Sequence, residues 1–230
     1  MQDHGKALPD GFTVKTAGWS YFIIIATSLL ALVLLNGRFT VTGDSGATVM
    51  KMAEHSLSVR MSLLYEVLMF SGVILLSASL YSILKPINEL LARTALLLRI
   101  GEAILGYLGV ACSLAVLAVL ESSGGNPNVV MQAVQLYELR EACCLVLMAC
   151  ISLGTIINFA LFHRSRFIPR FLSVWGMAGF SLMLAASVFR FLDLEDGPLL
   201  NAIAAVAAIS FEIVIGLWLI VRGAGPGARR

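Results

Sequence analysis

Apolar residues fall into long, nearly uninterrupted blocks along this chain. A helix that spans a bilayer needs about 20 apolar residues, because the hydrocarbon core is about 30 Å thick and each helical residue rises about 1.5 Å. Transmembrane strands are disfavoured, since they are short and alternate apolar with polar residues. The pattern therefore predicts an all-α fold, a polytopic integral membrane bundle of six transmembrane helices. The predicted spans are 17–35, 62–84, 94–120, 143–162, 171–192 and 199–221.

The longest connection between spans is 37–61. Its Gly-Asp-Ser sequence at 43–45 is typical of a turn followed by a helix cap. The segment 49–61 then has an amphipathic pattern, which fits either a helix at the outer membrane interface or an extension of the second span. The fourth span has a more polar helical lead-in that begins near Val129.

Positive charges gather on one side of the predicted bundle. Of the 16 Lys and Arg residues, ten fall on one side, four on the other, and Arg99 and Arg140 lie inside or beside spans. By the positive-inside rule the richer side is cytoplasmic, and it holds both termini, which requires an even number of spans. The ten are Lys6, Lys15, Lys85, Arg93, Arg164, Arg166, Arg170, Arg222, Arg229 and Arg230, and the four are Arg38, Lys51, Arg60 and Arg190.

The spans divide the chain into three parts: a cytoplasmic N-terminal tail (1–16), a six-helix transmembrane domain (17–222) and a cytoplasmic C-terminal tail (223–230). The first span is interpreted as retained, because its apolar run is longer than that of a signal peptide and no small-x-small cleavage site follows Leu35.

Composition narrows the function. Hydrophobic residues make up 59% of the chain, charged residues 13%, and the mean hydropathy is +0.90. Soluble domains are about 45–50% apolar and about 25% charged, so a soluble enzyme, a nucleic-acid binder and a secreted disulfide scaffold are excluded. The net charge of +2 is too small to indicate an acidic partner. Membrane lipids are the expected partners, and a homo-oligomer or a partner subunit stays open.

Ionisable groups inside spans are costly and are often functional. Counted from the basic residues at the cytoplasmic ends of their helices, Glu102 and Glu212 lie about 14–15 Å deep, near the bilayer midplane. Arg99 precedes Glu102 by three residues and shares its helix face. Ser77 and Thr155 reach a similar level, about 12 Å deep. The candidate ligand-binding residues are therefore Arg99, Glu102, Glu212, Thr155 and Ser77.

The charges at this level do not balance. Arg99 stays protonated and can pair with one carboxylate. The other carboxylate must take a proton, bind a cation or face a water-filled cavity. This imbalance favours a protein that binds or transports a small ligand, a cation or a proton. The alternative is a structural clamp of Arg99, Glu102 and Glu212 that shares one proton and only locks three helices together.

A second group of charged residues lies nearer the outer surface. Glu138 and Glu141 are three residues apart on one helix face, where they could form the mouth of a cation or proton relay. Ordinary ion pairs at a wet rim are the favoured interpretation. The predicted outer rim comprises Glu66, Glu138, Arg140, Glu141 and Arg190.

Signs of catalysis are weak. The sequence shows no Ser-His-Asp arrangement, no metal-ligand spacing among its three histidines and no lysine in mid-span, and all four cysteines lie within predicted spans. No catalytic residue, metal or cofactor is therefore indicated. Whether the protein is an enzyme stays open. A structural or accessory subunit of a membrane complex is the main alternative to binding or transport, and a lipid-modifying membrane enzyme is less favoured.

Six stretches, in order along nearly the whole chain, resemble the bacterial membrane family catalogued as domain of unknown function 4386. The resemblance implies a six-helix bundle in a bacterial cytoplasmic membrane, with Arg99, Glu102 and Glu212 at family-type positions, and it implies no activity. The stretches are 43–48 (GDSGAT), 80–88 (LYSILKPIN), 98–104 (LRIGEAI), 164–170 (RSRFIPR), 211–213 (FEI) and 217–220 (LWLI).

Overall fold

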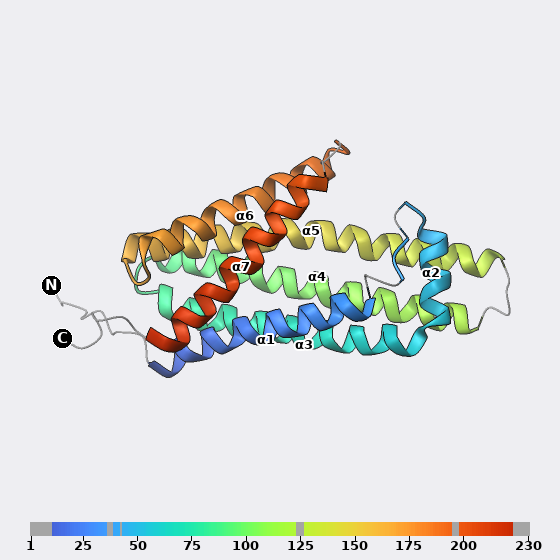
Figure 1. Ribbon diagram of the computed structural model, residues 1–230, viewed down its shortest axis with the longest axis horizontal. Coiled ribbons are helices and arrows are strands. Elements are labelled where there is room, and N and C mark those ends of the chain that lie inside the picture. Colours follow the sequence, from blue (N-terminus) through green and yellow to red (C-terminus); the bar gives the residue numbers. More distant parts are fainter. Residues whose placement is uncertain (1–10, 36–38, 42, 123–126, 195–197, 223–230) are drawn as a thin grey trace.

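The computed structural model describes residues 11–35, 39–41, 43–122, 127–194 and 198–222. All regular structure in these ranges is helical, in seven helices (Figure 1). The helices are α1 (Gly11–Leu35), α2 (Ser45–Glu54), α3 (Ser56–Leu84), α4 (Glu89–Glu121), α5 (Pro127–Ser165), α6 (Arg170–Phe191) and α7 (Pro198–Arg222).

Length and composition mark this as a multi-pass membrane protein. Helices α1, α3, α4, α5 and α6 are long and apolar enough to cross a bilayer, and the described part of α7 has a shorter apolar stretch, Val206–Val221. The predicted all-α polytopic bundle is therefore confirmed, whereas the count of six spans stays a prediction. The start of α1 and the end of α7 lie at the same end of the bundle (Figure 1), as an even number of spans requires.

The six long helices form a closed ring of neighbours. Along this ring α1 packs on α3, α3 on α4, α4 on α5, α5 on α6, α6 on α7, and α7 returns to α1. Helix α7 crosses the bundle obliquely, so its first half meets α6 and its second half meets α1 (Figure 1). Side chains from separate parts of the chain therefore meet inside the ring.

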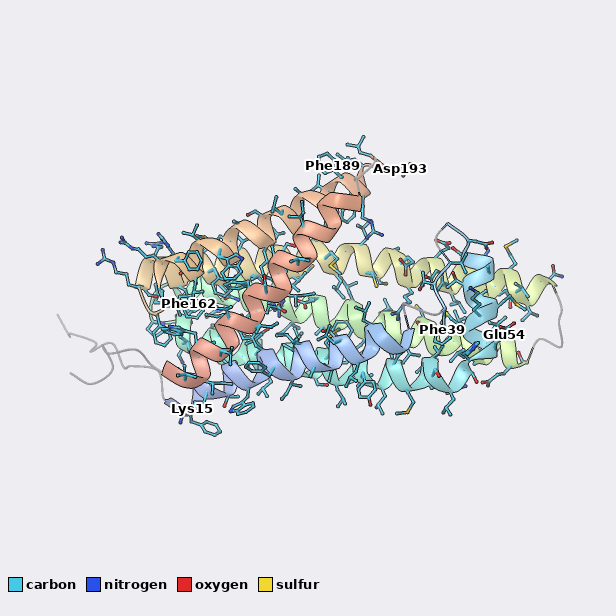
Figure 2. All side chains as sticks on the ribbon, in the orientation of Figure 1. Lys15, Phe39, Glu54, Phe162, Phe189 and Asp193 are labelled. Carbon is cyan, nitrogen blue, oxygen red and sulfur yellow. The ribbon has the colours of Figure 1, made fainter. Side chains whose placement is uncertain are left out.

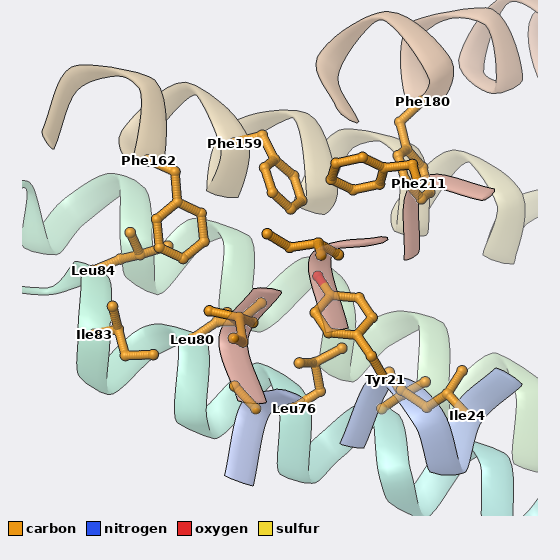
Figure 3. Packing of buried hydrophobic residues seen from close by; sticks show 14 of the residues in the cluster. Tyr21, Ile24, Leu76, Leu80, Ile83, Leu84, Phe159, Phe162, Phe180 and Phe211 are labelled. Atoms are coloured by element: carbon orange, nitrogen blue, oxygen red, sulfur yellow. The ribbon is translucent and has the colours of Figure 1, made fainter. Parts of the chain in front are cut away.

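Aromatic rings fill much of the interior on the predicted cytoplasmic half. Phe159 and Phe211 meet edge to face with centroids 4.7 Å apart, and Phe162 and Phe180 are buried beside them (Figure 3). Glycines make room for such rings. A Cβ atom on Gly176 would lie 2.6 Å from the Phe211 ring, so this position holds α6 and α7 close together.

A similar notch joins α3 to α4. A Cβ atom on Gly106 would lie 2.1 Å from Cζ of Phe70, so the Phe70 ring occupies the space that a side chain at Gly106 would need. The smallest residue therefore lets these two helices approach around a large ring.

The opposite end of the bundle is a separate small unit, which we call the outer head: α2 together with the adjoining ends of α3, α4 and α5. Figure 2 shows Phe39 and Glu54 at this end and Lys15 and Phe162 near the other. Helix α5 has 39 residues and is about 58 Å long, well beyond the 30 Å or so of a hydrocarbon core. Val49, Met52 and other apolar residues give the head its own core.

The turn and cap predicted at 43–45 are confirmed. Gly43 has a φ of +78°, and the Asp44 carboxylate accepts a hydrogen bond of 2.8 Å from the Ala47 amide at the start of α2. The segment 49–61 divides between the two alternatives: its first part belongs to α2, which packs across α5, α4 and α3, and its second part extends α3 back to Ser56. The polar lead-in to the fourth span is part of the continuous helix α5.

Candidate functional site

Helix α4 places Arg99 and Glu102 inside the ring. The helix starts at a defined point, because the Asn88 side chain accepts a hydrogen bond of 3.0 Å from the Leu91 amide. The Arg99 and Glu102 side chains are only 5% and 3% exposed, and Nη1 of Arg99 lies 2.7 Å from Oε2 of Glu102. The predicted shared face is therefore a buried ion pair within one helix.

This ion pair is close but poorly satisfied. Neither Nη1 of Arg99 nor Oε2 of Glu102 has a hydrogen-bond partner among the described residues, so the N–H group does not point along the line between the two atoms. Buried polar groups are normally hydrogen-bonded, and exceptions need an explanation. The pair therefore keeps hydrogen-bonding capacity for another group.

Helix α5 contributes a surface for Arg99. A Cβ atom on Gly154 would lie 3.1 Å from Cγ of Arg99 and 3.3 Å from the Ala95 carbonyl oxygen. The aliphatic part of the Arg99 side chain therefore packs against the backbone at Gly154. Thr155 and Asn158 lie next to Gly154 and one turn beyond it, and both are buried.

Thr155 and Asn158 also have free hydrogen-bonding groups. Neither side chain makes a hydrogen bond to any residue that the structure describes. Ser77 differs, since its hydroxyl donates to the Val73 carbonyl at 2.6 Å within its own helix. Of the two uncharged residues predicted for the site, Thr155 is therefore available to a ligand and Ser77 is engaged.

The second carboxylate comes from α7. Glu212 is half-buried and lies within electrostatic range of Arg99 and Glu102, but it has no Lys, Arg or His nitrogen within 4.0 Å among the described residues. The structure thus brings the three predicted charged residues into one region and leaves Glu212 outside the ion pair.

Helix α1 adds Tyr21, which the sequence analysis missed. Its side chain is buried among apolar residues (Figure 3), and it lies within electrostatic range of Glu212 and Arg99. A Cβ atom on Gly216, one turn after Glu212, would lie 3.1 Å from Cβ of Tyr21, so Tyr21 packs on the same face of α7 as Glu212. A single tyrosine in an apolar span gives no sequence signal that separates it from an ordinary membrane aromatic residue.

Asn158 was missed as well, although a signal existed. It is a carboxamide in an otherwise apolar part of the predicted fourth span, three residues after Thr155 and on the same helix face. We call the set drawn from α1, α4, α5 and α7 the mid-bundle site. Its members are Tyr21, Arg99, Glu102, Thr155, Asn158 and Glu212.

A second buried ion pair lies nearer the outer head. Nη2 of Arg140 donates to Oε1 of Glu66 at 2.8 Å, and Nη1 donates to the Ser113 hydroxyl at 2.9 Å and to the Gly109 carbonyl oxygen at 3.2 Å. The Arg140 and Glu66 side chains are 15% and 12% exposed. This arrangement, which we call the outer clamp, joins α3, α4 and α5, and its arginine is well partnered where Arg99 is not.

The other predicted rim residues do not join the outer clamp. Glu138 is exposed and accepts a short hydrogen bond from the Ser45 hydroxyl of α2, and Glu141 is half-buried. Arg190 is exposed near the end of α6. The rim residues are therefore spread over the head and over α6 rather than gathered into one mouth.

The described residues include no group of three or more His, Cys, Asp or Glu side chains placed to hold a metal ion. The four cysteines are free thiols, two of them buried.

Comparison with known proteins gives one match. The family model described as "Domain of unknown function (DUF4386)" matches residues 16–223, which is nearly the whole chain. No curated protein and no solved structure matches the chain. The resemblance seen in the six stretches is therefore confirmed, and the description of the family assigns no activity.

Proposed function

We propose that this chain, which is a multi-pass membrane protein of the DUF4386 family, binds and moves a small ligand, cation or proton at the mid-bundle site. The observation that carries the proposal is the Glu212 carboxylate, which lies within electrostatic range of a buried Arg99–Glu102 ion pair and has no cation of its own within 4.0 Å among the described residues. We place the protein in the bacterial cytoplasmic membrane, with both termini inside the cell.

The cost of removing a charge from water determines what Glu212 needs. An ionised carboxylate away from water loses far more hydration energy than a neutral group, so it persists only when it is paired, protonated or hydrated. The exposed part of Glu212 gains little, because at this depth the surroundings are predicted to be lipid rather than water. A positively charged ligand is therefore the partner that the site needs.

Unused hydrogen-bonding groups around the charged residues favour a site that binds a ligand over a purely structural clamp between helices. Arg99, Glu102, Thr155 and Asn158 all keep unused donors or acceptors within the described structure. A small polar ligand that enters the ring can use these groups, and each unsatisfied buried group otherwise costs about 1–3 kcal/mol.

The test uses Glu102→Gln and Glu212→Gln, with Glu66→Gln in the outer clamp as the matched control. Purified variants in liposomes are assayed for uptake of protons, Na⁺ and K⁺ with internal indicators. We expect Glu212→Gln and Glu102→Gln to lower uptake at least about tenfold, which corresponds to about 1.4 kcal/mol. Glu66→Gln should keep uptake per folded molecule. Wild-type uptake in both site variants would refute the proposal.

A structural or accessory role is the second candidate, because the outer clamp shows that this bundle already uses a buried ion pair to join helices. Under that role Glu102→Gln and Glu212→Gln lower thermal stability in detergent while uptake stays at the level of empty liposomes for every variant. Purification from native membranes with a stable partner subunit would favour it.

A further inference from the structure

We propose that the exchangeable ligand of the mid-bundle site is a single proton held by Glu212, with Tyr21 as the residue that positions its carboxyl group. This inference rests on the proposed function and specifies the ligand of the same site.

Arg99 is committed to Glu102 by the fold of α4 itself. The two residues are three apart on one helix, and their side-chain atoms meet at 2.7 Å. Both members of this pair therefore come from one helix. Glu212 comes from α7, which meets α1 and α6 in the ring, so it approaches an ion pair that is already formed.

The permanent positive charge of Arg99 favours a proton over a metal cation as the ligand of Glu212. A metal cation bound at Glu212 would add a second fixed positive charge in the electrostatic range of the guanidinium, in a medium that screens charges weakly. A proton removes the negative charge of Glu212 and adds no separate cation. The resulting site is neutral overall, with one ion pair and one carboxylic acid.

The groups around Glu212 agree with this choice. On α1 and α6, which both pack on α7, the charged residues within the described ranges are Lys15 near the start of α1 and Arg170 and Arg190 near the two ends of α6. The other ionisable side chains in this region are Tyr21 on α1, Arg99 and Glu102 on α4, and Cys150 on α5, which lies within electrostatic range of Glu102. Among the described residues, Arg99 is thus the permanent cation that lies within electrostatic range of Glu212.

Tyr21 packs against α7 within electrostatic range of Glu212, without a hydrogen bond to it in the described structure. It packs on α7 at Gly216, one turn from Glu212, and its side chain is buried. A phenol hydroxyl donates one hydrogen bond and accepts others, so it can donate to the carbonyl oxygen of a protonated carboxyl group. Glycine at 216 permits this approach, because any larger side chain would meet the Tyr21 stem.

The experiment is infrared difference spectroscopy of the full-length protein in lipid nanodiscs, between acidic and alkaline buffer, in H₂O and D₂O. Wild-type protein should show one carbonyl band of a buried carboxylic acid that shifts in D₂O. Glu212→Gln should lose that band and Glu66→Gln should keep it. Tyr21→Phe should move it to higher frequency, because it removes the phenol hydroxyl that donates to the protonated carboxyl group in this proposal. Circular dichroism verifies that each variant is folded.

Three outcomes are distinguishable. Absence of the band in wild-type protein, a measurement that needs no variant, overturns the inference, as does a band that survives in Glu212→Gln. If titration calorimetry with NaCl or KCl instead shows binding that Glu212→Gln abolishes, the proton inference fails and the proposed function stands. If there is neither a band, nor binding, nor uptake, both fail.

Discussion

At the scale of single residues, the smallest side chains decide where the charged ones can lie. Gly154 gives the Arg99 stem a flat surface of backbone, and Gly216 gives Tyr21 the same on α7. Gly101 lies on α4 between Arg99 and Glu102, but a Cβ atom there meets nothing within 4 Å. The glycines near the site are therefore not equivalent, and substitutions at Gly154 and Gly101 should have different effects.

We expect Gly154→Val to displace Arg99 and to destabilise the protein by about 1–3 kcal/mol, because extra atoms in a packed interface force neighbours to move. Uptake in liposomes should fall with it. Gly101→Ala is the control: it should leave uptake unchanged and stabilise the helix by up to about 1 kcal/mol, since alanine is the better helix former. Thermal melts in detergent measure both, and equal effects would contradict the role given to Gly154.

The outer clamp carries a second prediction at this scale. Arg140→Ala leaves the mostly buried Glu66 carboxylate unpaired, and breaking a buried pair in this way costs about 3–5 kcal/mol. The matched control is Glu89→Gln, whose partner Arg93 is exposed, so the loss should be about 1 kcal/mol or less. Denaturant or thermal unfolding in detergent compares the two variants. A loss at Arg140 as small as the control would mean that the pair does not hold the helices.

At the scale of helices, the Phe70–Gly106 contact between α3 and α4 lies between two polar levels. Glu66 is one turn from Phe70 on α3, and Glu102 is one turn from Gly106 on α4. The aromatic ring therefore separates the outer clamp from the mid-bundle site by an apolar layer.

Gly106→Ala tests this helix contact, because its Cβ atom would lie 2.1 Å from the Phe70 ring. We expect a loss of about 1–3 kcal/mol from overpacking. The double variant Gly106→Ala/Phe70→Leu should recover part of the loss, since the smaller side chain leaves the space free. A double variant that is no more stable than Gly106→Ala would show that the ring is not the obstacle; melting temperatures in detergent decide.

The helices themselves were largely predictable, and their partnerships were not. The length of an apolar run predicts a span, because the hydrocarbon core has a nearly constant thickness. The predicted span 171–192 therefore nearly coincides with helix α6. The Glu66–Arg140 pair joins residues 74 apart, and nothing in the pattern of either helix specifies the other. Depth counting placed Arg99, Glu102 and Glu212 at one level, but it could not show that the Ser77 hydroxyl bonds within its own helix or that Tyr21 lies within electrostatic range of Glu212.

At the scale of the whole molecule, the closed ring gives every long helix two long neighbours, and the outer head covers one end of α3, α4 and α5. The two ends of the bundle therefore differ: the long helices end close together at the predicted cytoplasmic end, whereas α3, α4 and α5 extend beyond α1 and α6 at the other end (Figure 1). The distribution of positive charge between these two ends predicts the orientation of the protein in the membrane.

We expect Glu54 to lie outside the cell and Lys85 inside it. In a variant without the four native cysteines, a membrane-impermeant maleimide should label Glu54→Cys in intact cells, and Lys85→Cys only after permeabilisation. Both positions are exposed, so reactivity reports sidedness rather than burial. Labelling of Lys85→Cys in intact cells would reverse the orientation or change the number of spans.

The ring also has a consequence for biosynthesis. Helix α7 follows the other five long helices in the sequence, and it is the one that links α1 back to α6. During insertion by the translocation machinery, Arg99 and Glu102 enter the lipid together on α4 and neutralise each other from the start. Glu212 on α7 enters the membrane afterwards. The Arg99 guanidinium is therefore already paired in the nascent chain before the last helix inserts.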